Sequence, residues 1–348
     1  MTNALALIEK IELGHILTRS DAESVMEALL SGQVGSPTIV RLLLALNERP
    51  VSVAELAGFA TIMRRHAAPV FSSNEARPEL MVDTCGTGGD AGGTFNISTA
   101  SAFVASAAGA IVAKHGNRSV SSRSGSADVL EALGVRIDAP LVLAGRAVRE
   151  VGIGFLFAPA AHAATLYAVP ARKQIGTRTI FNLLGPLTNP AGAQAQVLGV
   201  FSPDVLELMA ATLGELGVRR AFVLHGSGLD EISLAGETRI AEVRDGTIKA
   251  YSVTPEDFGL PRAPLEALRG GSPQENASLI LQILQGEKGP RHDVVVANAA
   301  AALVAASIAQ DFRIGAQLAS RAISSGAALD KLELLRAFMK QDDAANKK

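Results

Sequence analysis

Residues 80–99 read LMVDTCGTGGDAGGTFNIST, and this stretch decides the fold class. A short apolar run at 80–82 leads into a segment with five glycines between residues 86 and 93. Asn96, Ser98 and Thr99 then open an alanine-rich segment that predicts a helix over 97–108. Glycines let a backbone approach a ligand, and free amides at a helix N-terminus attract phosphate. The order strand, glycine loop, helix start therefore favours a phosphate site over a plain loop.

The glycine spacing matches neither the P-loop pattern nor the Rossmann pattern, so both of those sites fit poorly. Further along the chain, short apolar runs alternate with helical segments, which predicts a mainly parallel sheet flanked by helices. Such sheets bind ligands at the carboxyl ends of their strands. The expected strands include the runs 80–82, 110–113, 135–137, 155–157, 197–201 and 221–224.

The first 72 residues predict helices alone, which we interpret as a small helical domain. Ser20 with Glu23, and Ser52 with Glu55, have the spacing of capping boxes, and Ser36-Pro37 predicts another helix start. A second segment without strand character spans about 162–190, and we expect it to return to the helical domain. The α/β domain is then expected to comprise residues 78–160 and 191–345.

A second polar loop follows the expected strand at 110–113. Residues 114–126 read KHGNRSVSSRSGS and contain Lys114, Arg118 and Arg123 together with five serines. Lysine supplies a point charge for phosphate and arginine supplies a planar fork. A solvated basic loop is the alternative, but two donor-rich loops on neighbouring strands suit a polyphosphate.

An acidic pair, Asp230-Glu231, follows the expected strand at 221–224. Adjacent carboxylates at this edge of a sheet can hold Mg²⁺, which keeps several waters and bridges to substrate phosphates. Taken alone, such a pair is more often an ordinary surface feature. His162 alone is more often structural than catalytic, and Cys85 has no evident base partner for a nucleophile's role.

Composition narrows the class of protein. The chain has 348 residues, 48% apolar and 19% charged, with a net charge of −2, which disfavours disorder and lacks the basic excess of nucleic-acid binders. Its one cysteine, Cys85, fits a reducing compartment. Glu9, Lys10 and Glu12 interrupt the region where a signal peptide needs apolar residues. We expect a cytoplasmic protein with no membrane and no nucleic-acid partner.

Six motifs, in this order, resemble those of the anthranilate phosphoribosyltransferase family. They are GTGGD at 86–90, TFNIST at 94–99, KHGNR at 114–118, GSAD at 125–128, RTIFNLLGPLTNP at 178–190 and DE at 230–231. The resemblance covers essentially the whole chain. It implies a helical domain hinged to an α/β domain, a homodimer formed through the helical domains, and Mg²⁺-dependent transfer of a phosphoribosyl group from phosphoribosyl pyrophosphate (PRPP) to anthranilate in tryptophan biosynthesis.

The resemblance also implies site residues. The metal ligands would be Ser98, Asp230 and Glu231. The anthranilate contacts would be Gly86, Asn117 and Arg172, with His115 and His162 along the path of the aromatic substrate. The PRPP contacts would be Gly86, Gly89, Asp90, Thr94, Asn96, Ile97, Ser98, Thr99, Lys114, His115, Gly116, Asn117, Arg118, Ser119, Val120, Ser121, Ser122 and Ser126.

The expected chemistry needs no catalytic acid, base or nucleophile, because the amine of anthranilate is already neutral at pH 7. Two other functions stay open on the sequence. A pyrimidine nucleoside phosphorylase shares the architecture but uses free phosphate, without an expected KHGNR motif or paired acidic site. A non-enzymatic relative that binds nucleic acid should have a basic surface and lack Asn117 and Arg172.

Overall fold

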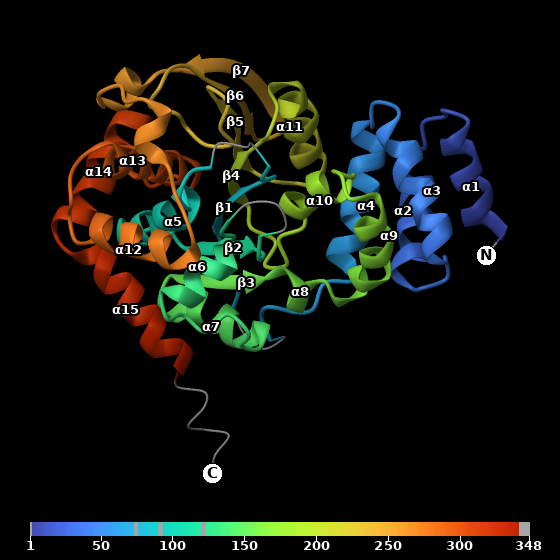
Figure 1. Cartoon of the computed structure of the whole chain (residues 1–348), viewed down its shortest axis with the longest axis horizontal. Coiled ribbons are helices and arrows are strands. Elements are labelled where there is room, and N and C mark those ends of the chain that lie inside the picture. Colours follow the sequence, from blue (N-terminus) through green and yellow to red (C-terminus); the bar gives the residue numbers. More distant parts are fainter. Residues whose placement is uncertain (1, 73–75, 90–92, 120–122, 341–348) are drawn as a thin grey trace, which may run out of the picture.

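The computed structural model describes residues 2–72, 76–89, 93–119 and 123–340, and its N-terminal part is a bundle of helices (Figure 1). Apolar side chains at helical spacing, such as Ile39, Leu42 and Leu43, are buried between these helices. The helices are α1 (Thr2–Glu12), α2 (Arg19–Leu30), α3 (Ser36–Asn47) and α4 (Val53–Arg65).

The two expected capping boxes have different outcomes. The one at the start of α4 is confirmed, since Ser52 and Glu55 cap each other reciprocally. The one at Ser20 is wrong, because the N-cap of α2 is Thr18, two residues earlier, whose hydroxyl accepts from the backbone N–H of Asp21 at 3.2 Å. Glu55 also connects α4 to the segment before α2, because its buried carboxylate accepts from the backbone N–H of Leu17 at 3.0 Å.

A seven-stranded sheet forms the centre of the larger domain, with strand order β3-β2-β1-β4-β5-β6-β7. The first five strands in this order are parallel, and β6 and β7 continue the sheet as an antiparallel hairpin. This confirms the expected fold class. The strands are β1 (Val82–Gly86), β2 (Val112–Gly116), β3 (Ile153–Phe157), β4 (Ala195–Gly199), β5 (Arg220–Gly226), β6 (Thr238–Arg244) and β7 (Thr247–Val253).

Helices cover both faces of the sheet (Figure 1). Successive residues of a strand point to opposite faces, so Val197 packs in the core with α5 and α13 while Leu198 packs in the core with α11 and the bundle. The bundle is therefore continuous with one face of the sheet. The flanking helices are α5 (Ile97–Ala107), α6 (Ser126–Ala132), α7 (Leu141–Glu150), η2 (Pro203–Val205), α11 (Leu206–Glu215), η3 (Pro255–Phe258), η4 (Leu265–Leu268), α12 (Pro273–Leu284), α13 (Pro290–Ala305), α14 (Phe312–Ser324) and α15 (Ala327–Lys340).

The segment after β3 leaves the sheet and packs on the bundle (Figure 1). Helix α9 contacts α3, and α10 contacts α4. Ala171, Phe181 and Leu184 are buried in the same core as the bundle helices. The elements of this segment are α8 (Ala158–Ala161), η1 (Ala163–Ala168), α9 (Val169–Ile175) and α10 (Phe181–Leu187).

Two features of the sheet differ from the sequence-based expectation. The apolar run 135–137 is not a strand, because Val135 and Ile137 are buried in the main core as part of the connection between α6 and α7. The hairpin β6–β7 was not predicted. Its turn is Asp245-Gly246, with φ of 47° and 81°, a pair that suits the tight turns of β-hairpins.

Candidate functional site

Three loops emerge at the carboxyl ends of the parallel strands, and we name them by their composition. The glycine loop (residues 86–94) follows β1, the basic loop (residues 114–126) spans the end of β2 and the start of α6, and the acidic loop (residues 227–231) follows β5. Strand β1 pairs with β2 on one side and with β4 on the other, and β4 pairs with β5. The loops therefore share one edge of the sheet. Asp90 and residues 120–122 lie outside the described residues.

The acidic pair lies directly against the glycine loop and the start of α5. The backbone N–H of Gly88 donates to Asp230 Oδ2 at 3.0 Å, and the N–H of Ser98 donates to Glu231 Oε1 at 3.1 Å. A tight turn makes this possible, since Ser227 and Gly228 have φ of 50° and 90° and Gly226 and Leu229 exchange backbone hydrogen bonds. The chain thus reverses just before Asp230 and returns towards β1.

The oxygen atoms gathered here are suitable ligands for a magnesium ion. They are the two carboxylates of the acidic pair and the hydroxyl of Ser98, on the residue whose amide binds Glu231. Within the part of the chain that the structure describes, no group of three or more His, Cys, Asp or Glu side chains could hold a metal by itself. Mg²⁺ is usually held by one or two carboxylates plus substrate phosphates and water, so this set fits it.

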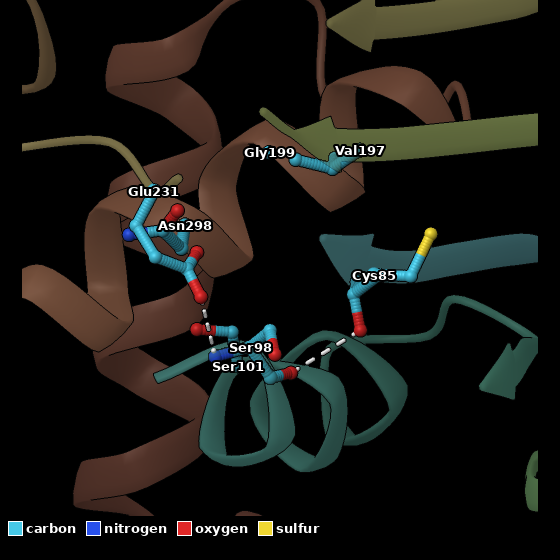
Figure 2. A pocket seen from close by; sticks show the side chains of 8 residues that line it. Cys85, Ser98, Ser101, Val197, Gly199, Glu231 and Asn298 are labelled. Atoms are coloured by element: carbon cyan, nitrogen blue, oxygen red, sulfur yellow. Dashed lines mark hydrogen bonds between the residues drawn. The ribbon is translucent and has the colours of Figure 1, made fainter. Parts of the chain in front are cut away.

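A small cavity lies beside Glu231 of the acidic pair (Figure 2). Figure 2 shows the Glu231 carboxylate directed at the first turn of α5, where it accepts from the N–H of Ser98. The lining residues are Thr84, Cys85, Ser98, Ser101, Val197, Gly199, Glu231 and Asn298.

Lys114 lies under the first turn of α5, buried within the fold. Its Nζ donates to the backbone carbonyl of Thr84 and lies 3.3 Å from the hydroxyl oxygen of Ser98. Burial lowers the pKa of Lys114, and the nearby charge of Asp83 opposes that shift. Lys114 therefore supports Ser98 from below and places positive charge behind the acidic pair.

Asp83 is the buried counter-charge of this lysine. Its carboxylate accepts from the backbone N–H of His115 at 3.1 Å and from Asn189 Nδ2 at 2.8 Å. Burial raises the pKa of Asp83 to about 6, against the opposing charge of Lys114. Asn189 also donates to the carbonyl of Ala113 at 2.8 Å, so the end of the RTIFNLLGPLTNP segment is bonded to both β1 and β2.

Asn96, at the N-cap of α5 just after the glycine loop, is joined to the basic loop. Its Nδ2 donates to the carbonyl of Ser124 at 3.0 Å, and its Oδ1 accepts from the Ser124 hydroxyl at 3.1 Å. Asn276 on α12 also donates to this oxygen, at 2.9 Å. The side chain of Asn96 is therefore used to connect the start of α5 to the basic loop. Thr94 is held beside them by a β-bridge with Arg269.

The described part of the basic loop is shaped by Asp128 at the start of α6. Asp128 Oδ2 accepts from the backbone N–H groups of Ser119 and Gly125, both at 2.9 Å. Arg118 pairs with Asp128 at 3.0 Å and with Glu131 at 2.8 Å, and these bonds raise the pKa of Arg118. Arg118 is thus engaged with α6.

Gly116 makes room for the start of that helix. A Cβ atom at Gly116 would lie 2.2 Å from the hydroxyl oxygen of Ser126. Ser126 donates to the carbonyl of Asn117 at 3.4 Å, while Asn117 Oδ1 accepts from the N–H of Arg118 at 2.7 Å.

The residues expected along the aromatic substrate's path come from two sides. The rings of His115, on β2, and His162, after α8, meet edge to face with centroids 5.3 Å apart. His162 Nε2 donates to the carbonyl of Thr188 at 2.9 Å. Arg172 is held on the bundle side, with its guanidinium carbon 5.1 Å from the centroid of the Phe181 ring.

Both histidines are expected to stay neutral throughout the physiological range. Burial lowers the pKa of His115 to about 3 and also lowers the pKa of His162. Because the folded protein resists protonation, their contribution to stability is lost as pH falls below about 6.5. In NMR spectra assigned with the His115→Gln and His162→Gln variants, the ring C–H signals of His115 should not titrate between about pH 5 and 8, and those of His162 should titrate below the pH of an ordinary imidazole. A midpoint near neutrality for either ring would contradict this.

Arg178 is a contact that the sequence did not reveal. Its guanidinium donates to the carbonyl of Gly89 in the glycine loop and lies 4.2 Å from the centroid of the Phe201 ring. Its own carbonyl accepts from Asn47 Nδ2 of α3 at 2.8 Å. The residue therefore links the bundle to the glycine loop. It is the first residue of the segment RTIFNLLGPLTNP, in which no local sequence signal marks its partner.

The sequence matches two parts of one family over most of its length. Residues 78–329 match the glycosyl transferase family, a/b domain, and residues 5–67 match its helical bundle domain. Among the described residues, no helix has the length and apolar character needed to cross a bilayer.

Named relatives agree with this assignment. The anthranilate phosphoribosyltransferase of Symbiobacterium thermophilum is 50% identical over 334 residues, covering 96% of this chain and 97% of the relative. The crystal structure of the Thermus thermophilus enzyme of that name superposes with a TM-score of 0.91 at 47% identity, covering 96% and 99% of the two chains. The Saccharomyces cerevisiae enzyme in complex with PRPP and Mg gives a TM-score of 0.87 at 27% identity, covering 97% and 98%. The chain therefore belongs to the anthranilate phosphoribosyltransferase family.

Proposed function

We propose that this protein transfers the phosphoribosyl group of PRPP to the amine of anthranilate, giving N-(5-phosphoribosyl)anthranilate and pyrophosphate, as a Mg²⁺-dependent step of tryptophan biosynthesis. Membership of the family supports this, as does the yeast relative in complex with PRPP and Mg. One observation of this chain carries the proposal. The amide of Gly88, the first turn of α5 and the acidic pair Asp230-Glu231 meet at a single point.

We infer that PRPP lies over this point with its pyrophosphate towards the acidic pair. Ser98, Asp230 and Glu231 would hold the metal ion, which the pyrophosphate would also contact. The hydroxyl groups at the start of α5 and the backbone of the glycine loop would supply donors for phosphate oxygens. Lys114 and Asn96 would act from beneath, by holding Ser98 and the basic loop in place.

The remaining proposed contacts with PRPP are backbone and hydroxyl groups of the glycine loop, the basic loop and the first turn of α5. Those in described residues are Gly86, Gly89, Thr94, Ile97, Thr99, His115, Gly116, Asn117, Arg118, Ser119 and Ser126. Asp90, Val120, Ser121 and Ser122 complete the proposal from outside the described residues.

We infer that anthranilate binds between the sheet edge and the bundle. Gly86 and Asn117 would contact it from the sheet, and Arg172 would pair with its carboxylate from α9. His115 and His162 present an edge-to-face pair of rings to an aromatic substrate. Because both rings are neutral, they offer a surface without a second cation.

The chemistry follows from charge and position. Bond breaking puts positive character on the ribose and negative charge on the departing pyrophosphate. When bound, a divalent cation would offset that negative charge. Hydrogen-bond donors of the glycine loop and of the start of α5, placed beside the pyrophosphate, would stabilise the same charge. Holding the neutral amine beside the anomeric carbon supplies the rest, so we assign no residue as an acid, base or nucleophile.

We further propose that the protein is a cytoplasmic homodimer paired through the bundle. The described bundle and the segment beside it expose large apolar side chains, namely Leu5, Leu13, Ile16, Leu44, Leu166, Tyr167 and Val169. Leu166→Glu should shift sedimentation from dimer to monomer. Ile308→Glu, at an exposed apolar side chain after α13, should leave the dimer intact. A wild-type monomer at micromolar concentration would contradict the pairing.

Loss of anthranilate fluorescence tests the function directly. The signal should fall only when PRPP and Mg²⁺ are both present, and each is omitted in turn. A parallel reaction offers thymidine with inorganic phosphate, and a gel-shift at physiological salt offers single-stranded DNA. Phosphorolysis or DNA binding without anthranilate consumption would replace the proposal with one of these rival functions.

A further inference from the structure

Asn298 lies in the middle of α13, behind the acidic loop, and is almost completely buried at 2% exposure. Its Oδ1 accepts from the backbone N–H of Ile232 at 2.9 Å. Its Nδ2 donates to the carbonyl of Ile232 at 3.2 Å and to the carbonyl of Val294 in its own helix at 2.9 Å. One side chain thus bonds both polar groups of the residue that follows Glu231.

This pattern needs a carboxamide. Pairing with the N–H and the C=O of one residue requires an acceptor and a donor side by side, as a neighbouring strand would offer. The acidic loop emerges at the end of β5, and the hairpin strand β6 begins only at Thr238. Asn298 therefore takes the place of a strand partner at Ile232, and the helix anchors the loop from behind.

The anchor lies close to the proposed metal ligands. Asn298 and Glu231 line the same cavity with Ser98 (Figure 2). Helix α13 is in turn tied to α5, because the Ser101 hydroxyl donates to the carbonyl of Val295 at 3.2 Å. The two joined helices therefore serve both sides of the site. Helix α5 carries Ser98, and α13 holds the backbone of Ile232, the residue after Glu231.

We propose that Asn298 is a positioning residue for the divalent cation, because it fixes the backbone that presents Asp230 and Glu231. The inference rests on the proposed function only in assuming that these carboxylates bind a metal ion. Without Asn298, the acidic loop keeps its residues but loses its fixed orientation towards Ser98. Partners behind the ligands of a metal site typically change metal affinity by about 10- to 100-fold when removed.

Two variants test the proposal. Asn298→Leu removes all three hydrogen bonds with a similar volume. Asn298→Asp keeps the shape and an acceptor for Ile232, but sets a carboxylate against the carbonyls of Ile232 and Val294. The control is Ser106→Ala, which removes a buried hydrogen bond from the far end of α5 to the carbonyl of Gly152. Asn298→Asp carries the test if Asn298→Leu does not fold, as judged by circular dichroism.

The primary measurement is the binding of Mn²⁺, a spin-active substitute for Mg²⁺, followed by electron paramagnetic resonance with and without PRPP. The dissociation constant for Mn²⁺ should rise about 10- to 100-fold in both variants and stay within about twofold in Ser106→Ala. In the fluorescence assay, the Mg²⁺ concentration for half-maximal rate should rise by the same factor, and high Mg²⁺ should restore kcat.

The outcomes separate the two proposals. Unchanged Mn²⁺ binding in folded Asn298 variants, with only a lower melting temperature, would make Asn298 structural and overturn the inference. An equal loss of Mn²⁺ binding in Ser106→Ala would overturn it as well, since general loosening would then explain the effect. Failure of the wild type to consume anthranilate, with Mn²⁺ binding shifted as expected, would overturn the proposed reaction and leave the role of Asn298 supported.

Discussion

Replacing both Asp230 and Glu231 by alanine is expected to lower kcat by about 10²- to 10³-fold, the range for losing one electrostatic contribution in an active site. The two carboxylates lie on the amide of Gly88 and the amide of Ser98, where the glycine loop meets α5. Removing them leaves Ser98 as the sole protein ligand of the proposed set. The rate is measured by anthranilate fluorescence over a wide range of Mg²⁺ concentrations.

A matched control separates the effect of losing the proposed metal ligands from the effect of changing the net charge of the protein. Glu256 and Asp257 form another adjacent acidic pair, at η3, where Glu256 pairs with Arg262 at 2.7 Å. Their double alanine variant changes the net charge equally and should retain wild-type turnover and Mg²⁺ dependence. The assignment of the metal ligands fails if the Asp230/Glu231 variant turns over normally at limiting Mg²⁺.

Gly199→Ala is expected to abolish Mn²⁺ binding and to lower the free energy of unfolding by about 3 kcal/mol, the upper end of the usual overpacking cost. A Cβ atom at Gly199 would lie 1.6 Å from the carbonyl oxygen of Asp230 and 2.4 Å from its carbonyl carbon. Strand β4 cannot move aside, because Gly199 pairs with Gly86 on β1 and with Leu224 on β5. The acidic loop would have to move instead.

Urea unfolding and Mn²⁺ titration measure the two effects separately. The control is Gly214→Ala in α11. A Cβ atom at Gly214 would meet nothing closer than Cγ1 of Val243, at 3.9 Å. That substitution should stabilise the helix by about 0.5–1 kcal/mol and leave the metal site unchanged. Normal Mn²⁺ binding by Gly199→Ala would mean that the close approach of the Asp230 backbone to Gly199 does not hold the carboxylates in place.

Much of this architecture could be predicted because its signals are local. The glycine loop, the alanine-rich start of α5 and the apolar run of β5 each follow directly from neighbouring residues. Parallel strands bring their carboxyl ends to one edge, so the meeting of Gly88 with Asp230 was also expected. The Asp-Gly turn of the hairpin β6–β7 is also a local signal, but its strands, TRIAEVR and TIKAYSV, lack the continuous apolar run that marks β5.

The errors and omissions have a common cause, which is that burial depends on distant partners. The run 135–137 resembles a strand in its apolar residues, yet it pairs with none of the seven strands in the described part of the chain, and Val135 and Ile137 fill the core instead. Asn298 and Asn189 sit in segments whose sequence marks no partner. Asn298 bonds Ile232, 66 positions away, and Asn189 bonds Asp83, 106 positions away.

The contact between the glycine loop and the acidic loop has a consequence for how the protein acquires function. The hydrogen bonds of Gly88 and Ser98 to the acidic pair join residues 142 and 133 positions apart. Contacts of such long sequence separation form slowly, because the intervening chain must first be ordered. We expect cation affinity to appear only in the last stage of refolding, so that a nascent chain released before β5 emerges would have no site to fill.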